Sequence, residues 1–197
     1  MSYLYAWKSL PNQVDIICPN CGGHAIFEIG LVRHLQHKQE VAYFQKSPIF
    51  DYEARMNSGQ KQHYVIGYPN LLGGYNETDL NLPDGYDIRS WLHPEIRGYS
   101  RHQDLGSYTC SQCLARKKYR LCLKDDAYYK TEIKQQVLWA LNRDSLIDLK
   151  HYIASNKRDA FAHQQASFLL HIPTVFKTRK SRKLVIAQID KLLADKR

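Results

Sequence analysis

Short apolar segments in the first half of the chain predict strands rather than helices. Residues 24–29 and 63–68 have the length and the β-branched and aromatic content of buried strands, and residues 41–44 are similar. The composition changes over residues 69–106, where Gly, Pro and Asn recur so densely that no long helix fits. We expect an ordered loop region there, with a short helix near residues 88–92.

The second half of the chain has the spacing of amphipathic helices. Apolar side chains recur at four-residue intervals over residues 129–141, which predicts a helix. Residues 142–145 either end this helix and cap a second one over residues 146–153, or the helix runs through them. Two further helices are expected over residues 157–171 and 181–194. The apolar positions that carry these predictions are Tyr129, Ile133, Val137 and Leu141, then Leu146, Leu149 and Ile153, and finally Val185, Ile189, Leu192 and Leu193.

The length and composition are those of a globular protein. The 197 residues suffice for one compact domain or two small ones, and 44% of them are hydrophobic. No apolar run approaches the roughly 20 residues that span a bilayer, and the first residues lack the pattern of a secretory signal. We therefore expect a cytoplasmic protein of bacterial or phage type with no membrane partner.

Four of the five cysteines form two CxxC pairs, Cys18 with Cys21 and Cys110 with Cys113. A reducing compartment disfavours structural disulfides, so paired CxxC motifs there indicate metal or redox chemistry. Two cysteines three positions apart both reach one metal ion when the backbone between them folds into a tight turn. Gly22 supplies the positive φ that such a turn needs after its second cysteine. The two pairs together predict one tetrahedral zinc site with four thiolate ligands.

The segment Cys18-Pro19-Asn20-Cys21-Gly22 resembles the opening knuckle of the zinc ribbon family, in which a second CxxC closes the site. The resemblance covers residues 18–23 and 110–113, and it implies a β-hairpin at the first knuckle. Here 88 residues separate the two pairs, against roughly 15–20 in compact zinc patterns. We therefore expect either an insertion between the knuckles or a site that joins the start and the middle of a larger fold.

The pattern and the resemblance together imply an α+β protein with two regions. Residues 1–125 are expected to form a β-rich, zinc-ribbon-like region that carries a long, loop-rich insertion over residues 24–106. Residues 126–197 are expected to form a helical region. Because four thiolates fill the zinc tetrahedron, the metal is expected to be structural rather than catalytic.

Two other interpretations of the cysteines remain open from the sequence. One is a redox CxxC, although neither pair lies at the start of a helix in an evident βαβ unit. The other is two unrelated sets of buried thiols. Cys122 is expected to be an ordinary buried thiol, which substitutes as a ligand only if one of the four does not bind, and His24 is a more distant substitute.

The positive charge of the chain is confined to its second half. Residues 1–105 contain 9 Lys and Arg against 11 Asp and Glu, a balance of −2. Residues 106–197 contain 19 Lys and Arg against 8 Asp and Glu, a balance of +11. This asymmetry indicates a polyanionic partner for the basic half, or an acidic protein surface.

Two basic clusters are candidate binding sites in this half, with a plain solvated surface as the alternative for each. The first follows the second knuckle directly and has a tyrosine among its cations, which suits phosphate contacts and base stacking. The second lies where the last helix should begin, with Thr178 or Ser181 as its cap. Cations there oppose the helix dipole, which favours an anion-binding role over a stabilising one. The clusters consist of Arg116, Lys117, Lys118, Tyr119 and Arg120, and of Lys177, Arg179, Lys180, Arg182 and Lys183.

The leading hypothesis from the sequence is a zinc-stabilised protein that binds DNA or RNA through phosphate-backbone contacts. The alternative is a protein-interaction adaptor or subunit of a larger complex, which uses tyrosines expected to be exposed between Tyr64 and Tyr108. No catalytic motif with an informative spacing is present. An enzyme would need a site assembled from scattered residues such as His63, His93 and His102.

Overall fold

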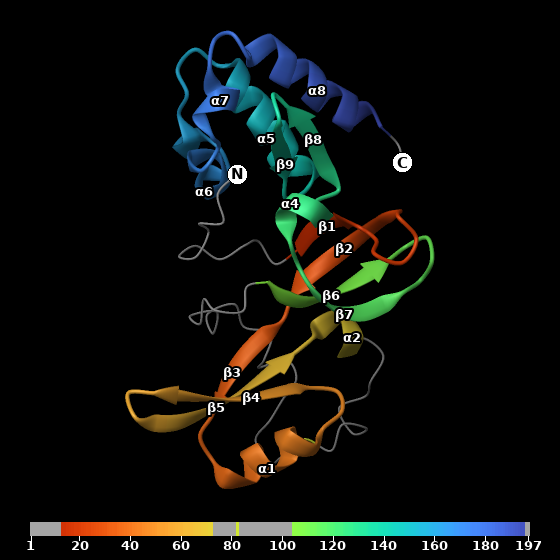
Figure 1. Ribbon diagram of the computed structural model, residues 1–197, viewed down its shortest axis with the longest axis vertical. Helices are drawn as coiled ribbons and strands as arrows, with labels where there is room; N and C mark the ends of the chain where they lie inside the picture. Colours follow the sequence, from red (N-terminus) through yellow and green to blue (C-terminus); the bar gives the residue numbers. More distant parts are fainter. Residues whose placement is uncertain (1–12, 73–81, 83–103, 196–197) are drawn as a thin grey trace. The chain divides into compact units, whose positions relative to one another are not determined.

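The computed structural model describes residues 13–72, 82 and 104–195, and it contains both sheets and helices (Figure 1). Sheets lie in the N-terminal and middle parts of the chain, and most of the helices lie in the C-terminal part. This distribution agrees with the predicted α+β class, while the zinc-ribbon-like character of the first part stays a prediction. The predicted short helix at residues 88–92 lies outside the described residues.

The described residues form two compact units, each assembled from segments that are distant in the sequence. The first contains residues 13–27, 109–115 and 121–195. The second contains residues 28–72, 82, 104–108 and 116–120. The expected division of the sequence at residue 125 is a different partition, and it stays a prediction.

A four-stranded sheet positions both CxxC motifs. Its order is β1-β2-β6-β7. The first motif lies between β1 and β2, and the second begins at the last residue of β6 and continues toward β7. Along β1 the side chains of Val14 and Ile16 are buried while Asp15 is not, which is the alternation of a strand with one face in the core. The predicted strand at residues 24–29 is confirmed as β2. The four strands are β1 (Gln13–Ile17), β2 (His24–Ile29), β6 (Leu105–Cys110) and β7 (Arg116–Arg120).

A three-stranded antiparallel sheet with one helix forms the core of the second unit. Its order is β3-β5-β4, and its strands are β3 (Leu31–Leu35), β5 (Gln60–Gly67) and β4 (Asp51–Asn57). Strand β5 confirms the apolar segment predicted at residues 63–68, and α2 (Pro69–Leu72) follows it. The buried core residues are Leu35, Phe44, Phe50 and Val65.

The strand predicted at residues 41–44 is wrong, because these residues lie in α1 (Lys38–Lys46). The Glu40 carboxylate accepts hydrogen bonds from the backbone amides of Gln36 and His37, each at 3.0 Å. This contact satisfies amides at the start of the helix, which otherwise have no partner. The helix then buries Phe44 against the sheet and leaves Ala42 exposed.

The helix predicted over residues 129–141 is also wrong. The structure has an antiparallel hairpin there, formed by β8 (Tyr129–Ile133) and β9 (Gln136–Ala140). Lys134 and Gln135 connect the strands, and both have positive φ, at 52° and 61°. Two consecutive residues with positive φ form the two-residue turn whose twist matches that of the flanking strands.

The helices after this hairpin agree with the predictions only in part. The predicted helices at residues 146–153 and 181–194 are confirmed as α5 (Arg143–Ala154) and α8 (Arg182–Ala194), which pack against each other. The single helix predicted at residues 157–171 is wrong, because a 3-10 helix (Ala160–Ala162) and α6 (Ala166–Leu170) occupy this region. The short helices α4 (Leu123–Asp126) and α7 (Thr174–Lys177) complete the part of the chain that is described.

Side-chain acceptors explain why residues 157–171 do not form one helix. The Asp159 carboxylate accepts from the amide of Phe161 at 2.9 Å, and the Asp148 carboxylate accepts from the amide of Gln165 at 3.2 Å. These carboxylates replace the carbonyl partners that a continuous helix would supply. Within the described residues, no helix has both the length and the apolar character needed to cross a membrane.

Candidate metal centre and nucleic-acid interface

The two CxxC motifs fold into turns of the same design. In the first, the amide of Cys18 donates to the carbonyl of Gly23 at 2.7 Å, and Gly22 has a φ of 78°. In the second, the amide of Cys110 donates to the carbonyl of Ala115 at 3.0 Å, and Leu114 has a φ of 57°. The positive φ predicted for Gly22 is therefore confirmed. Leu114 takes the same conformation at the corresponding position, although its residue type does not indicate it.

The four paired cysteines come together as predicted. Their Sγ atoms all lie within 4.8 Å of one another, and the distances are 3.7 Å for Cys18–Cys113 and 3.6 Å for Cys21–Cys110. Four sulfur atoms about 2.3 Å from one tetrahedral ion would be roughly 3.8 Å apart, so these separations fit a single metal ion. Cys18 and Cys110 are buried, Cys113 is half-buried and Cys21 is exposed. The cluster can therefore hold one metal ion close to the surface.

Hydrogen bonds around the sulfur atoms favour thiolate formation at one side of the cluster. The side-chain amide of Asn20 donates to the Sγ of Cys113 at 3.4 Å, and together with the backbone amide of Ala115 it lowers the pKa of Cys113 to about 6. A hydrogen bond from the backbone of Gly23 lowers the pKa of Cys21, but desolvation and the three other cysteines outweigh it and raise this pKa to about 12. Without a metal ion the cluster thus retains protons that a bound cation would displace.

The two predicted substitutes for a missing ligand make other contacts. The Nε2 atom of His24 lies 3.1 Å from the Oδ1 atom of Asp15, and its ring packs edge-to-face on Tyr128. The thiol of Cys122 donates to the Asp125 carboxylate at 3.1 Å, and this contact raises the pKa of Cys122. Among the described residues, only the four paired cysteines form a group with ligand atoms close enough for one metal ion.

The first basic cluster lies on β7, in the second unit, and half of its cations are engaged in ion pairs. The Nζ atom of Lys118 is 2.5 Å from Asp51 and lies over the ring of Tyr68, and Arg120 is 2.5 Å from Asp104. The remaining members are the exposed cations Arg116 and Lys117, and Tyr119, whose ring packs edge-to-face on Tyr108.

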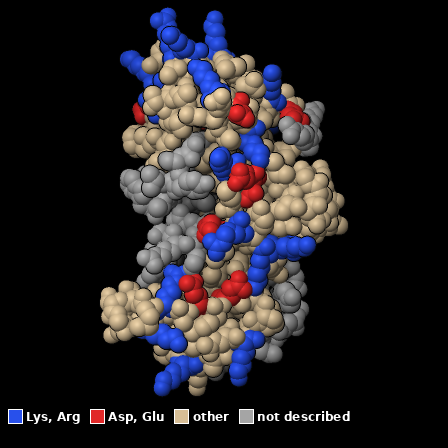
Figure 2. Space-filling model, viewed as in Figure 1, with Lys and Arg blue, Asp and Glu red and all other residues tan. Residues whose placement is uncertain are grey.

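The second basic cluster surrounds the start of α8, in the first unit. Arg179, Lys180 and Lys183 are exposed, and within the described residues none of them forms an ion pair. The other two members are Lys177, which is half-buried, and Arg182, which donates to the Asn156 side chain at 2.8 Å. Figure 2 shows Lys and Arg side chains gathered at the end of the view where α7 and the start of α8 lie in Figure 1.

The start of α8 lacks a side-chain cap. Ser181 occupies the predicted cap position, but its buried hydroxyl donates to the carbonyl of Val175 at 2.7 Å. Thr178, the other predicted cap, accepts from the amide of Ser181 at 3.2 Å and so orders the preceding turn. The helix therefore begins with positive side chains nearby and without an acidic residue in its first turn.

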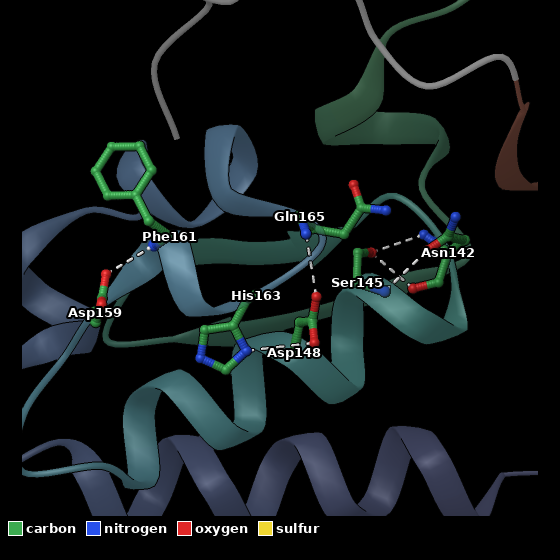
Figure 3. Close-up of polar contacts among 7 residues, drawn as sticks. All are labelled: Asn142, Ser145, Asp148, Asp159, Phe161, His163 and Gln165. Atoms are coloured by element: carbon green, nitrogen blue, oxygen red, sulfur yellow. Dashed lines mark hydrogen bonds and ion pairs between the residues drawn. The ribbon is translucent and has the colours of Figure 1, made fainter.

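An exposed aromatic residue of the first unit was not expected from the sequence. Phe161 is 77% exposed, in the 3-10 helix that precedes α6. Figure 3 shows its ring directed away from α5, while His163 and Gln165 face Asp148 on that helix. The sequence around Phe161 has no pattern that separates an exposed phenylalanine from a buried one.

The adaptor hypothesis expected exposed tyrosines between Tyr64 and Tyr108. The three of these tyrosines that the structure describes are buried, which corrects that expectation. Tyr64, Tyr68 and Tyr108 are each only 2% exposed. Burial and a hydrogen bond to Asp51 raise the pKa of Tyr68, so its hydroxyl is held inside the protein. The other tyrosines of this segment lie outside the described residues, and the adaptor hypothesis stays a prediction.

Of the three histidines named for a scattered active site, the structure describes His63. His63 forms a hydrogen bond through its Nδ1 atom with the hydroxyl of Tyr52. His93 and His102 lie outside the described residues.

Comparisons with known proteins give no relative from which a function could be taken. The chain matches no family model, no curated protein and no solved structure. The zinc ribbon resemblance therefore rests on residues 18–23 and 110–113 alone.

Proposed function

We propose that this chain holds one structural zinc ion in its four-cysteine cluster and binds nucleic acid through cations at the start of α8. The observation that supports the nucleic-acid part is the exposure of Arg179, Lys180 and Lys183 without ion pairs in the described part of the chain. The zinc part rests on the four sulfur atoms and their separations.

The chemistry of the cluster favours zinc as its occupant. A tetrahedral set of four thiolates suits zinc or an iron–sulfur centre. The paired knuckles at Cys18–Cys21 and Cys110–Cys113 are the usual arrangement for structural zinc, and the full thiolate shell leaves no position for a reacting water. Bound zinc supplies a link between two segments that are far apart in the sequence. Metal analysis of the purified protein should find zinc, and the protein should lack the visible absorption of an iron–thiolate centre.

Phosphate contacts are the interaction that the cations around α8 can make. Unpaired Lys and Arg side chains release counterions when they meet a nucleic-acid backbone, which makes binding favourable and sensitive to salt. The three exposed cations are held near one helix start, because the Ser181 hydroxyl fixes the chain between α7 and α8. Lys and Arg side chains that meet phosphates carry no sequence information, so we propose contacts with the backbone.

A fluorescence anisotropy titration tests the nucleic-acid role. Labelled DNA and RNA oligonucleotides should bind the full chain, and the logarithm of the affinity should fall linearly with the logarithm of the salt concentration. Replacing Arg179, Lys180 and Lys183 with Gln should weaken binding and reduce the salt slope by roughly 2–3, since each lost phosphate contact contributes about 0.7–0.9.

A matched variant separates a specific surface from overall charge. Lys124, Lys134 and Lys191 are also exposed, and replacing them with Gln removes the same three charges from the first unit. This control should leave the salt slope nearly unchanged. The nucleic-acid role is overturned if the wild-type chain shows no salt-sensitive binding, or if both triple variants reduce the slope equally.

A further inference from the structure

Phe161 has a large apolar side chain that is 77% exposed, and it lies five residues after Asn156, which contacts the second basic cluster. It lies in the 3-10 helix Ala160–Ala162, three residues after Arg158. Single exposed apolar residues are common on protein surfaces, so exposure alone does not indicate a site. The surroundings of Phe161 supply the further observations.

The backbone that carries Phe161 is fixed by several hydrogen bonds to carboxylates. The Asp159 carboxylate accepts from the amide of Phe161 at 2.9 Å. A second carboxylate, that of Asp148 on α5, accepts from the amide of Gln165 at 3.2 Å and lies 3.4 Å from the Nδ1 atom of His163 (Figure 3). The exposed ring therefore stands on a segment that is held in place on both sides, which lowers the entropy that binding would lose.

The same segment is joined to the second basic cluster. The side chain of Asn156 accepts a hydrogen bond from Arg182 at 2.8 Å, which holds the residues just before Phe161 against the start of α8. Five residues of chain from Asn156 reach Phe161, a span of at most about 18 Å. The segment that carries Phe161 and the start of α8 therefore meet at Asn156, within the first unit.

Two arginines of this surface have donors that the protein does not use. The Nε atoms of Arg158 and Arg182 are buried, and neither has a hydrogen-bond partner in the described residues. Because these two Nε atoms are buried, the phosphates of a bound strand would meet the exposed cations Arg179, Lys180 and Lys183 instead.

We propose that this surface binds single-stranded nucleic acid, with a base stacked on Phe161 and the adjoining phosphates on the cations around the start of α8. This inference rests on the proposed function and names its substrate class. An exposed aromatic ring beside a basic surface is the arrangement that proteins use to bind single strands without reading their sequence. In a duplex the base faces are covered by their neighbours, so Phe161 gains nothing from double-stranded DNA or RNA.

Anisotropy titrations of the full chain with four probes test this inference. The probes are a single-stranded DNA, a single-stranded RNA of the same sequence, and the corresponding duplexes, all at one salt concentration. The single strands should bind more tightly than the duplexes. Phe161→Ala should weaken single-strand binding by about 5- to 140-fold, the range for the loss of one stacked base, and leave duplex binding and the salt slope unchanged.

Two further variants control for shape and for general loss of apolar surface. Phe161→Trp keeps a ring that can stack, so it should retain single-strand affinity. Leu170→Ala removes a different exposed apolar side chain, at the end of α6, and should leave single-strand affinity unchanged. Thermal melting and zinc content should match the wild-type protein for all three variants, because Phe161 and Leu170 contribute little to the core.

The outcomes distinguish this inference from the function on which it rests. If the wild-type chain binds none of the four probes, both are overturned, and a protein partner becomes the better assignment for this surface. If it binds with the expected salt dependence but Phe161→Ala changes nothing, only the single-strand inference is overturned. A stronger effect on one of the two single strands identifies the natural ligand as DNA or RNA.

Discussion

At the residue scale, Gly22 and Leu114 occupy equivalent positions in the two knuckles although their side chains are very different. Each follows the second cysteine of a knuckle, and each has a positive φ. Glycine takes this conformation freely, whereas a residue with a Cβ atom loses about 1–2 kcal/mol through crowding with its carbonyl oxygen. The side chain of Leu114 is 78% exposed, so its burial offsets little of this backbone cost. The second knuckle is therefore the more strained of the two.

Exchanging the residue types should show this difference in strain. Gly22→Ala should destabilise the zinc-loaded protein by about 1–2 kcal/mol, since a Cβ atom there meets the backbone penalty although no neighbouring atom lies within 4 Å. Leu114→Gly should be neutral or stabilising, because relief of strain offsets the greater freedom of glycine in the unfolded chain. Chemical denaturation measures both changes. Equal destabilisation by the two substitutions would contradict the assignment of strain to Leu114.

The protonation of the cluster predicts how metal affinity depends on pH. Near neutral pH the lowered pKa of Cys113 leaves a thiolate, whereas the raised pKa of Cys21 keeps its proton. Binding as a thiolate requires Cys21 to lose that proton, and a rise in pH favours the deprotonated form. Affinity should therefore increase by about tenfold or more per pH unit, as each released proton requires. Competition with a chromophoric chelator between pH 6 and 8 measures this, and a pH-independent affinity would contradict it.

At the element scale, the segment from Tyr129 to Leu141 shows how one apolar pattern fits two structures. A four-residue interval approximates the helical period of 3.6 residues, but it is also a multiple of the two-residue period of a strand. The positions of Tyr129 and Ile133 are thus buried on one face of β8, as they would be on one face of a helix. Lys134 and Gln135 decide between the two, and neither is the Asn or Gly that usually marks a two-residue hairpin turn.

A double substitution in this turn separates the hairpin from the helix. Replacing Lys134 with Asn and Gln135 with Gly supplies the preferred residues for two positive φ angles, and it should stabilise the protein by about 1 kcal/mol. In a helix interior the same glycine would destabilise by about 1 kcal/mol. Because the two structures predict opposite signs, a lower denaturation midpoint for the double variant would contradict the hairpin.

Other elements could be predicted only where a local signal decided the structure. Asn142 caps α5 through a hydrogen bond from the amide of Ser145 at 2.9 Å, and this residue type at a helix start is a recognised signal. The start of α1 depends instead on the Glu40 carboxylate, which accepts hydrogen bonds from amides three and four positions earlier. The apolar residues 41–44 that follow it match the composition of a strand, so the sequence pattern did not indicate a helix. The division of residues 157–171 depends on Asp159 within the segment and also on Asp148, which lies outside it and is therefore invisible to a local pattern.

At the scale of the whole molecule, the metal centre was predictable and the binding surface largely was not. Four thiols with CxxC spacing have few chemical uses, so Cys18, Cys21, Cys110 and Cys113 were identified without knowledge of the fold. The basic clusters were also visible as runs of charge, but the ion pairs of Lys118 and Arg120 depend on acids from elsewhere in the fold. The exposure of Phe161 depends on tertiary packing, which residue type alone does not determine.

The long interval between the knuckles is compatible with a stable metal centre. Closing a longer loop adds only about 0.6 kcal/mol for each doubling of its length. Binding of structural zinc contributes on the order of 10 kcal/mol to folding, which far exceeds this difference. The site can therefore stabilise the first unit by joining residues 18–21 to residues 110–113, while the residues around α8 form the proposed binding surface.

The central claim, one zinc ion shared by both CxxC pairs, is tested most directly by measuring zinc content and thermal unfolding of Cys110→Ser. The Cys110 side chain is fully buried within the cluster, so its loss should release the metal and lower the melting temperature sharply. Cys122→Ser is the matched control, because Cys122 lies outside the cluster, and it should retain one zinc ion per chain and melt close to the wild-type protein. A Cys110→Ser protein that keeps its zinc and melts unchanged would contradict the shared site.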